Sequence, residues 1–521
     1  MTDRNRIIII GAGHNGLVCA AYLARAGREV LVLEASDRVG GAAITREFAP
    51  GFRVSACAHL CYQLDVSVSR ELKLEAHGLK TAYANLRTVA LATEGDHLVL
   101  NGGRLEAGLL PDKDRAALAD YHARMLRFAR VLGKQHNRRP PRIGGGRSEL
   151  IAAAMLGLDI RRLGRDPMRE FLRIAGINIF DVLEETFETP LLKGALALDA
   201  VLGTNLGPRS NNSVLTMLHR LSGQATGVAG GLSLPEGGMG AVSEALAAAA
   251  RASGVTVRTG SSVARITLEG DRVSGVELES GEKQTAGTVI SNADPARTLL
   301  QLLGARHLET GFVHRVRHFR SKGMAAKLHL ALDGLPTFKR LSAQRAGDRL
   351  VIAPDPTYIE RAFDHAKYGQ CSPDPALEIT IPSIHDRTMA PPGRHVLSAI
   401  VQYAPFDPRA STDAARAEFL ERTLGLLERY APGLRRQVVA SELLLPADIE
   451  REFRITGGHW HHGELALDQF LMLRPVPGAA QYAMPVNGLY LCGAGCHPGG
   501  GVMGSAGRNA ARAVLGGERA A

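Results

Sequence analysis

The fold of this chain is decided by one segment near its start, "IIIIGAGHNGLVCAAYLARAGREVLVLEASDRVGG", at residues 7–41. Its pattern predicts a fully apolar strand over residues 7–10, a helix over residues 17–26 and a second buried strand over residues 29–33. Two strands joined by such a helix pair in parallel. The segment is therefore predicted to open a parallel α/β sheet.

Glycines mark the turn between the first strand and the helix. Gly11, Gly13 and Gly16 form a G-x-G-x-x-G pattern, in which the glycines allow a tight bend, close approach of a pyrophosphate and close helix packing. His14 and Asn15 stand near the N-terminus of the predicted helix, where free N–H groups and the positive dipole end attract phosphates. The pattern predicts a Rossmann-type nucleotide site.

The residues that follow indicate which nucleotide is bound. Glu34 ends the second predicted strand, where a carboxylate accepts hydrogen bonds from ribose hydroxyls and disfavours the 2′-phosphate of NADP. Arg38, Gly40 and Gly41 then extend the motif as "DRVGG". A nicotinamide dinucleotide does not need this extension, whereas a flavin that continues into a second domain does. We therefore predict FAD.

Two later blocks complement the first. Residues 235–295 predict a helix, a β-hairpin and a returning strand, and residues 488–517 predict a short strand, a glycine-rich loop and a closing helix that begins near Ser505. We expect the three blocks to assemble into one discontinuous FAD-binding domain of the α/β class, with an inserted α+β substrate domain. The expected boundaries are 1–78, 225–300 and 456–521 for the first domain, and 79–224 and 301–455 for the second.

Composition places the chain in a broad class. Its 521 residues are 45% hydrophobic and 22% charged, which is typical of a protein with two or more soluble domains. Six cysteines in such a length do not make a disulfide scaffold. We find no apolar run of membrane-spanning length and little room for a leader before the first strand, so we expect a cytoplasmic protein.

The net charge of +10 is concentrated in two stretches, residues 124–142 and 160–174, where arginines alternate with apolar residues. One interpretation is a solvated helix face whose apolar side meets the protein's own core. The other is weak, peripheral contact with an anionic membrane surface. We expect no nucleic-acid partner, and the oligomeric state stays open.

Together these motifs resemble one family. The G-x-G-x-x-G turn, Glu34, "DRVGG", "VISNADP" (residues 289–295) and "GLYLCGAGCHPGGGVMG" (residues 488–504) are similar to the phytoene desaturase-like branch of the flavin amine oxidase superfamily. Within it, the chain resembles the group of desaturase-like carotenoid ketolases and pyridine nucleotide-disulfide oxidoreductase domain-containing protein 2. The likeness covers nearly the whole chain.

The resemblance implies non-covalently bound FAD and assigns residues to it. Glu34 would hold the adenosine ribose, Arg38 and Gly41 would line the pyrophosphate and flavin path, and the Val263 backbone would meet the adenine. The residues implied beside the isoalloxazine are Gly493, Val502 and Gly504. A helix starting near Ser505 would direct its N-terminus to the pyrimidine edge of the flavin, where negative charge appears on reduction.

Few side chains are expected to be catalytic, because the cofactor carries the chemistry. Lys327 lies in an apolar strand and resembles the flavin-facing lysine of amine oxidases; the alternative is an edge or snorkelling residue. His462 lies in "GGHWHHGE" (residues 457–464) and matches an "HGE" element of the family. We interpret it as a possible proton handler in a loop over the flavin. The additional His459 and His461 raise the alternative of a metal, but we expect none.

Cys57 and Cys61 lie roughly where disulfide reductases carry a redox pair, but their spacing and context differ, which favours small core residues. The leading hypothesis is an FAD-dependent oxidoreductase that removes hydride from a lipophilic substrate, with O2 or a quinone reoxidising the flavin. One alternative is an amine oxidase, although Gly501 and Val502 stand where an aromatic wall is usual. Another is a flavin-binding interaction protein with little turnover.

Overall fold

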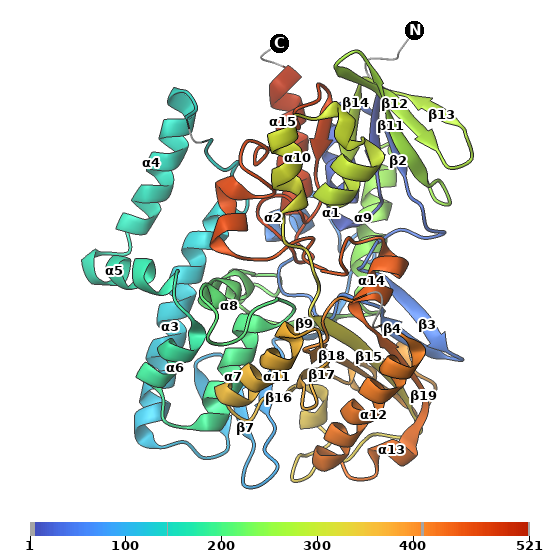
Figure 1. The fold of residues 1–521 in the computed structure, drawn as a ribbon. Helices are drawn as coiled ribbons and strands as arrows, with labels where there is room; N and C mark the ends of the chain where they lie inside the picture. The colour runs from blue at the N-terminus through green and yellow to red at the C-terminus, as the bar shows by residue number, and fades with distance from the viewer. Residues whose placement is uncertain (1–5, 143, 408–410, 519–521) are drawn as a thin grey trace.

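The computed structural model describes residues 6–142, 144–407 and 411–518. Figure 1 shows two regions, one built around the first and last segments of the chain and one built from the middle. Residues 1–5, on which the expectation about a leader rests, lie outside the described residues. No described helix is both long and apolar enough to cross a bilayer.

A five-stranded parallel sheet forms the centre of the first region, in the order β10-β2-β1-β14-β20. Its inner strands are apolar and buried on both faces, as a parallel sheet covered by helices requires. The three sequence blocks thus meet in one sheet, and the predicted Rossmann-type α/β fold is confirmed. The strands are β1 (Arg6–Ile10), β2 (Glu29–Leu33), β10 (Thr256–Arg258), β14 (Thr288–Ser291) and β20 (Leu489–Leu491).

Helix α1 (His14–Arg25) packs against both α9 (Gly240–Ala252) and α15 (Ser505–Glu518). It begins earlier than the predicted residue 17, because Gly13 already acts as the extended residue before the first turn. The described helix α15 begins at Ser505, as expected. The predicted hairpin belongs to a separate three-stranded sheet of β11 (Val263–Glu269), β12 (Arg272–Leu278) and β13 (Lys283–Thr285).

The second region contains an eight-stranded sheet in the order β19-β15-β18-β17-β16-β6-β7-β8. All its neighbours are antiparallel except β16 and β6. This mixed sheet is of the α+β class expected for the second region. Its strands are β6 (Thr88–Ala90), β7 (Leu98–Asn101), β8 (Arg104–Ala107), β15 (Ala325–Leu332), β16 (Arg349–Ile352), β17 (Ala376–Thr380), β18 (His395–Gln402) and β19 (Val438–Leu444).

Two short ladders and six further helices accompany the sheets in the described part of the chain. The short two-stranded ladders are β3 (Thr45–Ala49) with β4 (Phe52–Ser55), and β5 (Thr81–Ala84) with β9 (Ser233–Pro235). The remaining α-helices outside the layer described next are α2 (Val66–Glu71), α10 (Thr310–Arg317), α11 (Pro356–Lys367), α12 (Asp413–Tyr430), α13 (Leu434–Gln437) and α14 (Pro446–Phe453).

A helical layer lies beside the second sheet (Figure 1). It contains α3 (Asp112–Gln135), α4 (Arg147–Arg161), α5 (Arg165–Ile174), α6 (Ile179–Thr186), α7 (Pro190–Val201) and α8 (Ser213–Leu221). The last part of α3 buries Met125, Phe128 and Leu132, and α5 buries Phe171 and Ile174, in the same core cluster. Both basic stretches therefore turn most of their large apolar side chains inward, as the packing interpretation expects.

Candidate functional site

One long cavity runs from the parallel sheet into the second region. Its lining begins at Glu34 and Val263, passes the glycine-rich turn, and ends among Arg220, Glu378 and Ile400. Ligands of α/β sheets bind in the crevice at the carboxyl ends of the strands, and cofactor sites are often formed between domains. The cavity therefore has a nucleotide end and an inner end.

The nucleotide end is built for close backbone approach. Gly11 has a φ of +92°, which a residue with a side chain rarely adopts. A Cβ on Gly13 would come within 2.5 Å of the Asn292 side-chain nitrogen. Gly40 and Gly41 line the same cavity, and Gly40 bridges to Gly13. A side chain at these glycines would fill or distort the cradle, so the cradle fits a pyrophosphate.

Glu34 is fixed by the backbone around it. One carboxylate oxygen accepts the Ala12 N–H at 2.6 Å, and the other accepts the Ser36 N–H at 2.9 Å. The side chain is nearly buried and lines the cavity. Its remaining lone pairs are therefore held at the nucleotide end, where ribose hydroxyls can donate to them.

Helix α1 supplies buried polar atoms beside the cradle. His14 Nε2 and Asn15 Oδ1 have no hydrogen-bond partner among the described residues, although both side chains line the cavity. Burial lowers the pKa of His14 to about 4, so its ring is neutral at pH 7. Leaving such atoms unpaired is costly, and a bound polar ligand would satisfy them.

Four predicted cofactor residues do not line this cavity. The Arg38 guanidinium is half-exposed and pairs with the adjacent Asp37 at 3.1 Å instead of lining the cavity. Gly16 packs against the Gly11 carbonyl, and Gly493 packs against the Asn292 carbonyl. Gly504 lies beside Val18 and Val68. The structure gives these three glycines a packing role, whereas Val263 and Val502 do line the cavity.

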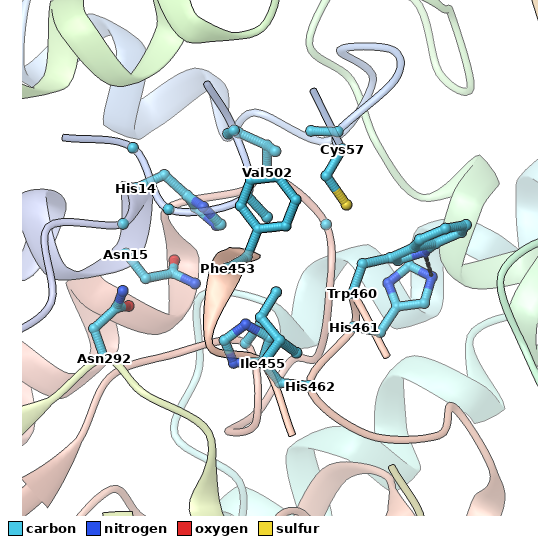
Figure 2. Close-up of a pocket in the computed structure, with 18 of the residues that line it drawn as sticks. His14, Asn15, Cys57, Asn292, Phe453, Ile455, Trp460, His461, His462 and Val502 are labelled. Carbon is cyan, nitrogen blue, oxygen red and sulfur yellow. Dashed lines mark hydrogen bonds between the residues drawn. The ribbon is translucent and has the colours of Figure 1, made fainter. Parts of the chain in front are cut away.

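The middle of the cavity contains residues that sequence reasoning did not assign. Figure 2 shows Phe453 with Asn15 and Asn292 on one side, and Trp460 and His461 on the other. Asn292 belongs to the "VISNADP" motif, and its contact with Gly13 could have been suspected from the parallel pairing of β1 and β14. Phe453 ends α14 and carries no sequence signal for such a position.

His462 lines the cavity (Figure 2). It has a φ of 54°, unusual for a residue with a side chain, and its buried Nδ1 has no partner among the described residues. Burial lowers the pKa of His462 to about 4, although Asp294 acts in the opposite direction. The neutral imidazole can donate a hydrogen bond to a ligand in the cavity or accept one from it.

Lys327 does not line the cavity itself but lies behind His59, which does. It is fully buried on β15, and its Nζ is hydrogen-bonded to His59 Nδ1. His59 itself lines the cavity. Burial lowers the pKa of Lys327 to about 7 and that of His59 well below its ordinary value. The structure therefore excludes an edge or snorkelling position and connects Lys327 to the cavity through His59.

The inner end carries a buried charge network. Arg220 contacts Glu378 at 2.9 Å and Asp199 at 3.3 Å, and Arg349 forms ion pairs with the same two carboxylates. Burial opposes ionisation of Glu378, but Arg349 and Arg220 outweigh it and hold the pKa of Glu378 below its ordinary value. Arg220 also lies over the Tyr62 ring, 5.0 Å from its centre. These residues come from distant segments, so no local motif could reveal them.

A polar wall faces the same end. Thr216 and His219 lie on one face of α8. His461 comes from a separate loop, and Gly500 contacts both histidines. Within the described residues, Thr216 Oγ1, His219 Nδ1 and His461 Nδ1 lack hydrogen-bond partners. Burial lowers the pKa of His219 to about 4 and that of His461 well below its usual range. Both rings are therefore neutral at pH 7.

The two open histidine nitrogens differ in character. His219 Nε2 lies 2.9 Å from the Gly500 carbonyl, which can only accept, so His219 Nδ1 carries a lone pair. Trp460 Nε1 can only donate, and it donates to His461 Nε2 at 3.2 Å, so His461 Nδ1 carries the hydrogen. The two unpaired nitrogens are thus one acceptor and one donor, and His461 Nδ1 lies against Gly500.

The alternatives for the cysteines and histidines can now be compared with the structure. All six cysteines lie in described positions and are free. Burial raises the pKa of Cys57 to about 12 and that of Cys61 to about 11, which favours inert thiols over a redox pair. In the described part of the chain, no group of three or more His, Cys, Asp or Glu side chains could hold a metal ion.

The parallel sheet, the glycine cradle with Glu34 and the cavity that continues toward the second sheet define a flavoprotein of the Rossmann type. The chain belongs to the flavin containing amine oxidoreductase family, whose model matches residues 16–515. It is an FAD-dependent oxidoreductase related to phytoene desaturases. The expected cofactor and family are confirmed.

Several known proteins are similar along nearly their whole length. The chain is 34% identical to pyridine nucleotide-disulfide oxidoreductase domain-containing protein 2 of Mus musculus, over 98% of this chain and 93% of that protein. It is 27% identical to one of the subunits of limonene dehydrogenase from Castellaniella defragrans (98% and 94%). It is 25% identical to a lycopene-forming phytoene desaturase of Pantoea ananas (97% and 98%).

Solved structures share the fold. An oxidoreductase from Methanosarcina mazei has a TM-score of 0.62 at 19% identity and covers 98% of this chain and 100% of that chain. Putrescine oxidase bound to putrescine has a TM-score of 0.60 at 16% identity, with 100% of each chain covered. At these identities the likeness concerns the fold alone.

Proposed function

We propose that the protein removes hydride from a lipophilic organic substrate at the inner end of the cavity, forming a C=C or C=O bond, with O2 or a quinone as the final acceptor. The observation that carries this proposal is the continuity of the cavity from the glycine cradle to Tyr62, Arg220 and Ile400. Bound FAD supplies the hydride-accepting chemistry. The protein's own residues bind, orient and exclude water.

Apolar side chains support a lipophilic substrate. Leu60, Leu202, Ile400 and Leu465 contribute to the lining of the inner part of the cavity. Two relatives carry hydrocarbon or terpene names, limonene dehydrogenase and phytoene desaturase. The apolar lining would bind such a substrate by removing its surface from water.

The balance of the reaction requires one proton to leave with each hydride. His59 lines the cavity and is hydrogen-bonded to Lys327, whose pKa is lowered to about 7 by burial. A neutral Lys327 can take a proton from the substrate through His59 at neutral pH. In this proposal, the pair handles the proton while the substrate gains its double bond.

The polar wall restricts the substrate further. A pure hydrocarbon would leave Thr216 Oγ1, His219 Nδ1 and His461 Nδ1 without partners, at about 1–3 kcal/mol for each buried group. A hydroxyl group that reaches His219 Nδ1 can donate to its lone pair. We therefore expect a lipophilic body that carries one hydroxyl-type group.

Amine oxidation is the second proposal, favoured by the aromatic rings of Tyr62 and Trp460 at the cavity. Aromatic faces attract cationic amines. However, the Arg220 guanidinium already stands over the Tyr62 ring, and Gly501 and Val502 leave no aromatic wall in the glycine-rich loop. These features support the lipophilic substrate over the amine.

An anaerobic titration separates the possibilities. The FAD-loaded protein is mixed with lipophilic alcohols and terpenes in one series and with primary amines in another, and the loss of flavin absorbance is followed. Bleaching by the first series supports the proposal. Bleaching by amines alone replaces it with the second. If neither series bleaches a flavin that dithionite reduces normally, the protein is a flavin-binding protein with little turnover.

A further inference from the structure

Helix α4 (Arg147–Arg161) presents large apolar side chains to solvent. Leu150 is 67% exposed, Ile151 63%, Met155 46% and Leu158 45%. The helix stands away from the body of the molecule, at the upper left of Figure 1. Contiguous apolar exposure of this kind marks an interaction surface.

The exposed residues share one side of the helix. At about 100° per residue, Leu150, Ile151, Ala154, Met155 and Leu158 fall within an arc of about 140°. We call these five residues the α4 face. A surface helix normally turns such a face inward, but α4 turns it outward.

Polar contacts outside the α4 face fix this orientation. Asp159, which follows the Met155 edge of the face around the helix, is buried, and its carboxylate accepts hydrogen bonds from Lys134 at 3.1 Å and from Arg138 at 2.7 Å. Near the start of the helix, Glu149 is bound by Arg139 and Gln481. Rotating α4 to hide its apolar face would break these polar contacts.

Arginines stand at both ends of the α4 face. By the same helical geometry, Arg147, Arg161 and Arg162 project on its side, and all three are exposed. None of them forms an ion pair with another described residue, whereas the neighbouring Arg138 and Arg139 are paired. The face is thus an apolar band between free positive charges.

We propose that the α4 face docks on an anionic lipid bilayer. Its apolar side chains would enter the boundary between headgroups and acyl chains, and the three arginines would meet lipid phosphates. The helix has 15 residues, a length of about 22 Å, so it can lie flat on the surface. This proposal does not depend on the identity of the substrate.

A second copy of the chain fits the face less well. Antiparallel pairing of two copies would set Arg147 of one against Arg161 and Arg162 of the other. Parallel pairing would set each arginine against its own counterpart. Both arrangements oppose like charges, which is unfavourable in a contact that excludes water. Anionic lipid supplies the charge that the face lacks.

Docking through α4 would place the membrane near the helices that line the cavity. Helix α4 packs on α3, and α3 packs on α8. Helix α8 carries Thr216, His219 and Arg220 of the cavity lining. A lipid-dissolved ligand would therefore meet the helical layer that borders the inner end of the cavity.

Vesicle sedimentation of the full-length, FAD-loaded protein tests the proposal. Vesicles of phosphatidylcholine alone are compared with vesicles that contain a quarter phosphatidylglycerol, at low and raised salt. We expect binding at least about tenfold stronger to the anionic vesicles, weakened by salt. Equal failure to bind either vesicle would overturn the proposal.

Variants assign the effect to α4. Leu150→Ser with Leu158→Ser should weaken binding about tenfold, and Arg161→Gln with Arg162→Gln should remove the preference for anionic vesicles. Leu109→Ser and Arg317→Gln alter exposed residues elsewhere and should bind as the wild type does. Flavin content and thermal unfolding confirm folding. Unchanged vesicle binding by the α4 variants would overturn the proposal, as would a lipid-free dimer that only these variants lose.

Discussion

The Lys327 ammonium and the His59 imidazole are hydrogen-bonded to each other inside the protein, and neither side chain has more than slight exposure to solvent. Two positive charges at this separation are unfavourable, so the pair holds at most one extra proton near neutral pH. His59 faces the cavity and Lys327 lies behind it. The pair therefore links a buried proton site to the place where a substrate would bind.

The first prediction concerns this pair. Burial lowers the pKa of Lys327 to about 7, so the fraction of neutral lysine rises as the pH passes through 7. The rate of flavin reduction by substrate should rise across the same range and should lose that dependence in Lys327→Met. Anaerobic stopped-flow measurements from about pH 5.5 to about pH 9 check it, a range that brackets the lowered pKa. An unchanged pH profile in the variant would assign the proton to another group, such as His462.

The same pKa shift predicts a stability difference. Below pH 7 the wild type keeps a charged lysine buried, and between pH 7 and the ordinary value of 10.5 the unfolded chain binds more protons than the folded chain. Wild-type stability relative to Lys327→Met should therefore be lowest below pH 7 and increase as the pH rises toward 10.5. Urea unfolding at several pH values measures this difference. A constant difference would contradict the shifted pKa.

The second prediction concerns the glycine cradle. Gly13→Val should abolish FAD binding, because a Cβ at Gly13 already approaches the Asn292 side chain to 2.5 Å and would occupy the path of the pyrophosphate. The ratio of flavin to protein absorbance measures the loss. Gly516→Ala is the control, since Gly516 lies in helix α15 and a Cβ placed on it would meet no atom within 4 Å. Full flavin content in Gly13→Val would refute this site.

The third prediction concerns the ribose contact. Glu34→Ala should weaken FAD binding by about 1.5–3 kcal/mol, because it removes a charged acceptor. The carboxylate also accepts the Ala12 and Ser36 N–H groups, so part of the loss would reach FAD through the loop. Glu34→Gln retains an acceptor and should lose less. Titration of the apoprotein with FAD measures both affinities. If Glu34→Ala binds FAD as tightly as the wild type does, Glu34 does not contact the ribose.

The fourth prediction concerns the charge network. Glu378→Gln should destabilise the fold by about 3–5 kcal/mol, because Arg220 and Arg349 would lose a buried partner. The pKa of Glu378 lies below its ordinary value, so its contribution is present above pH 4.5 and is lost as the pH falls through the folded-state pKa. Acid should therefore destabilise the wild type more than the variant.

Glu106→Gln is the control for this prediction. Glu106 is also bound by two arginines, Arg87 and Arg345, but it lies at the surface, where an ion pair contributes little. Urea unfolding of both variants gives the comparison. If Glu378→Gln lowers the free energy of unfolding no more than Glu106→Gln does, the buried network does not stabilise the fold.

The sequence by itself determined the parts of this protein that depend on local rules. The spacing of Gly11, Gly13 and Gly16 follows from backbone conformations that occur within a few residues, and the apolar runs of β1 and β2 follow from burial on both faces of a parallel sheet. Glu34 was predictable because it stands at a set distance along one βαβ unit. The cofactor could therefore be inferred from one short segment.

Only the tertiary structure decided the inner end of the cavity and the exposed face of α4. His59, Arg220 and Glu378 lie far apart in sequence, and their meeting depends on how the helical layer packs against the mixed sheet. The apolar residues of α4 would suit a buried helix equally well. The buried contacts of Asp159, outside the apolar face of that helix, set its rotation, and no local pattern encodes a contact of that kind.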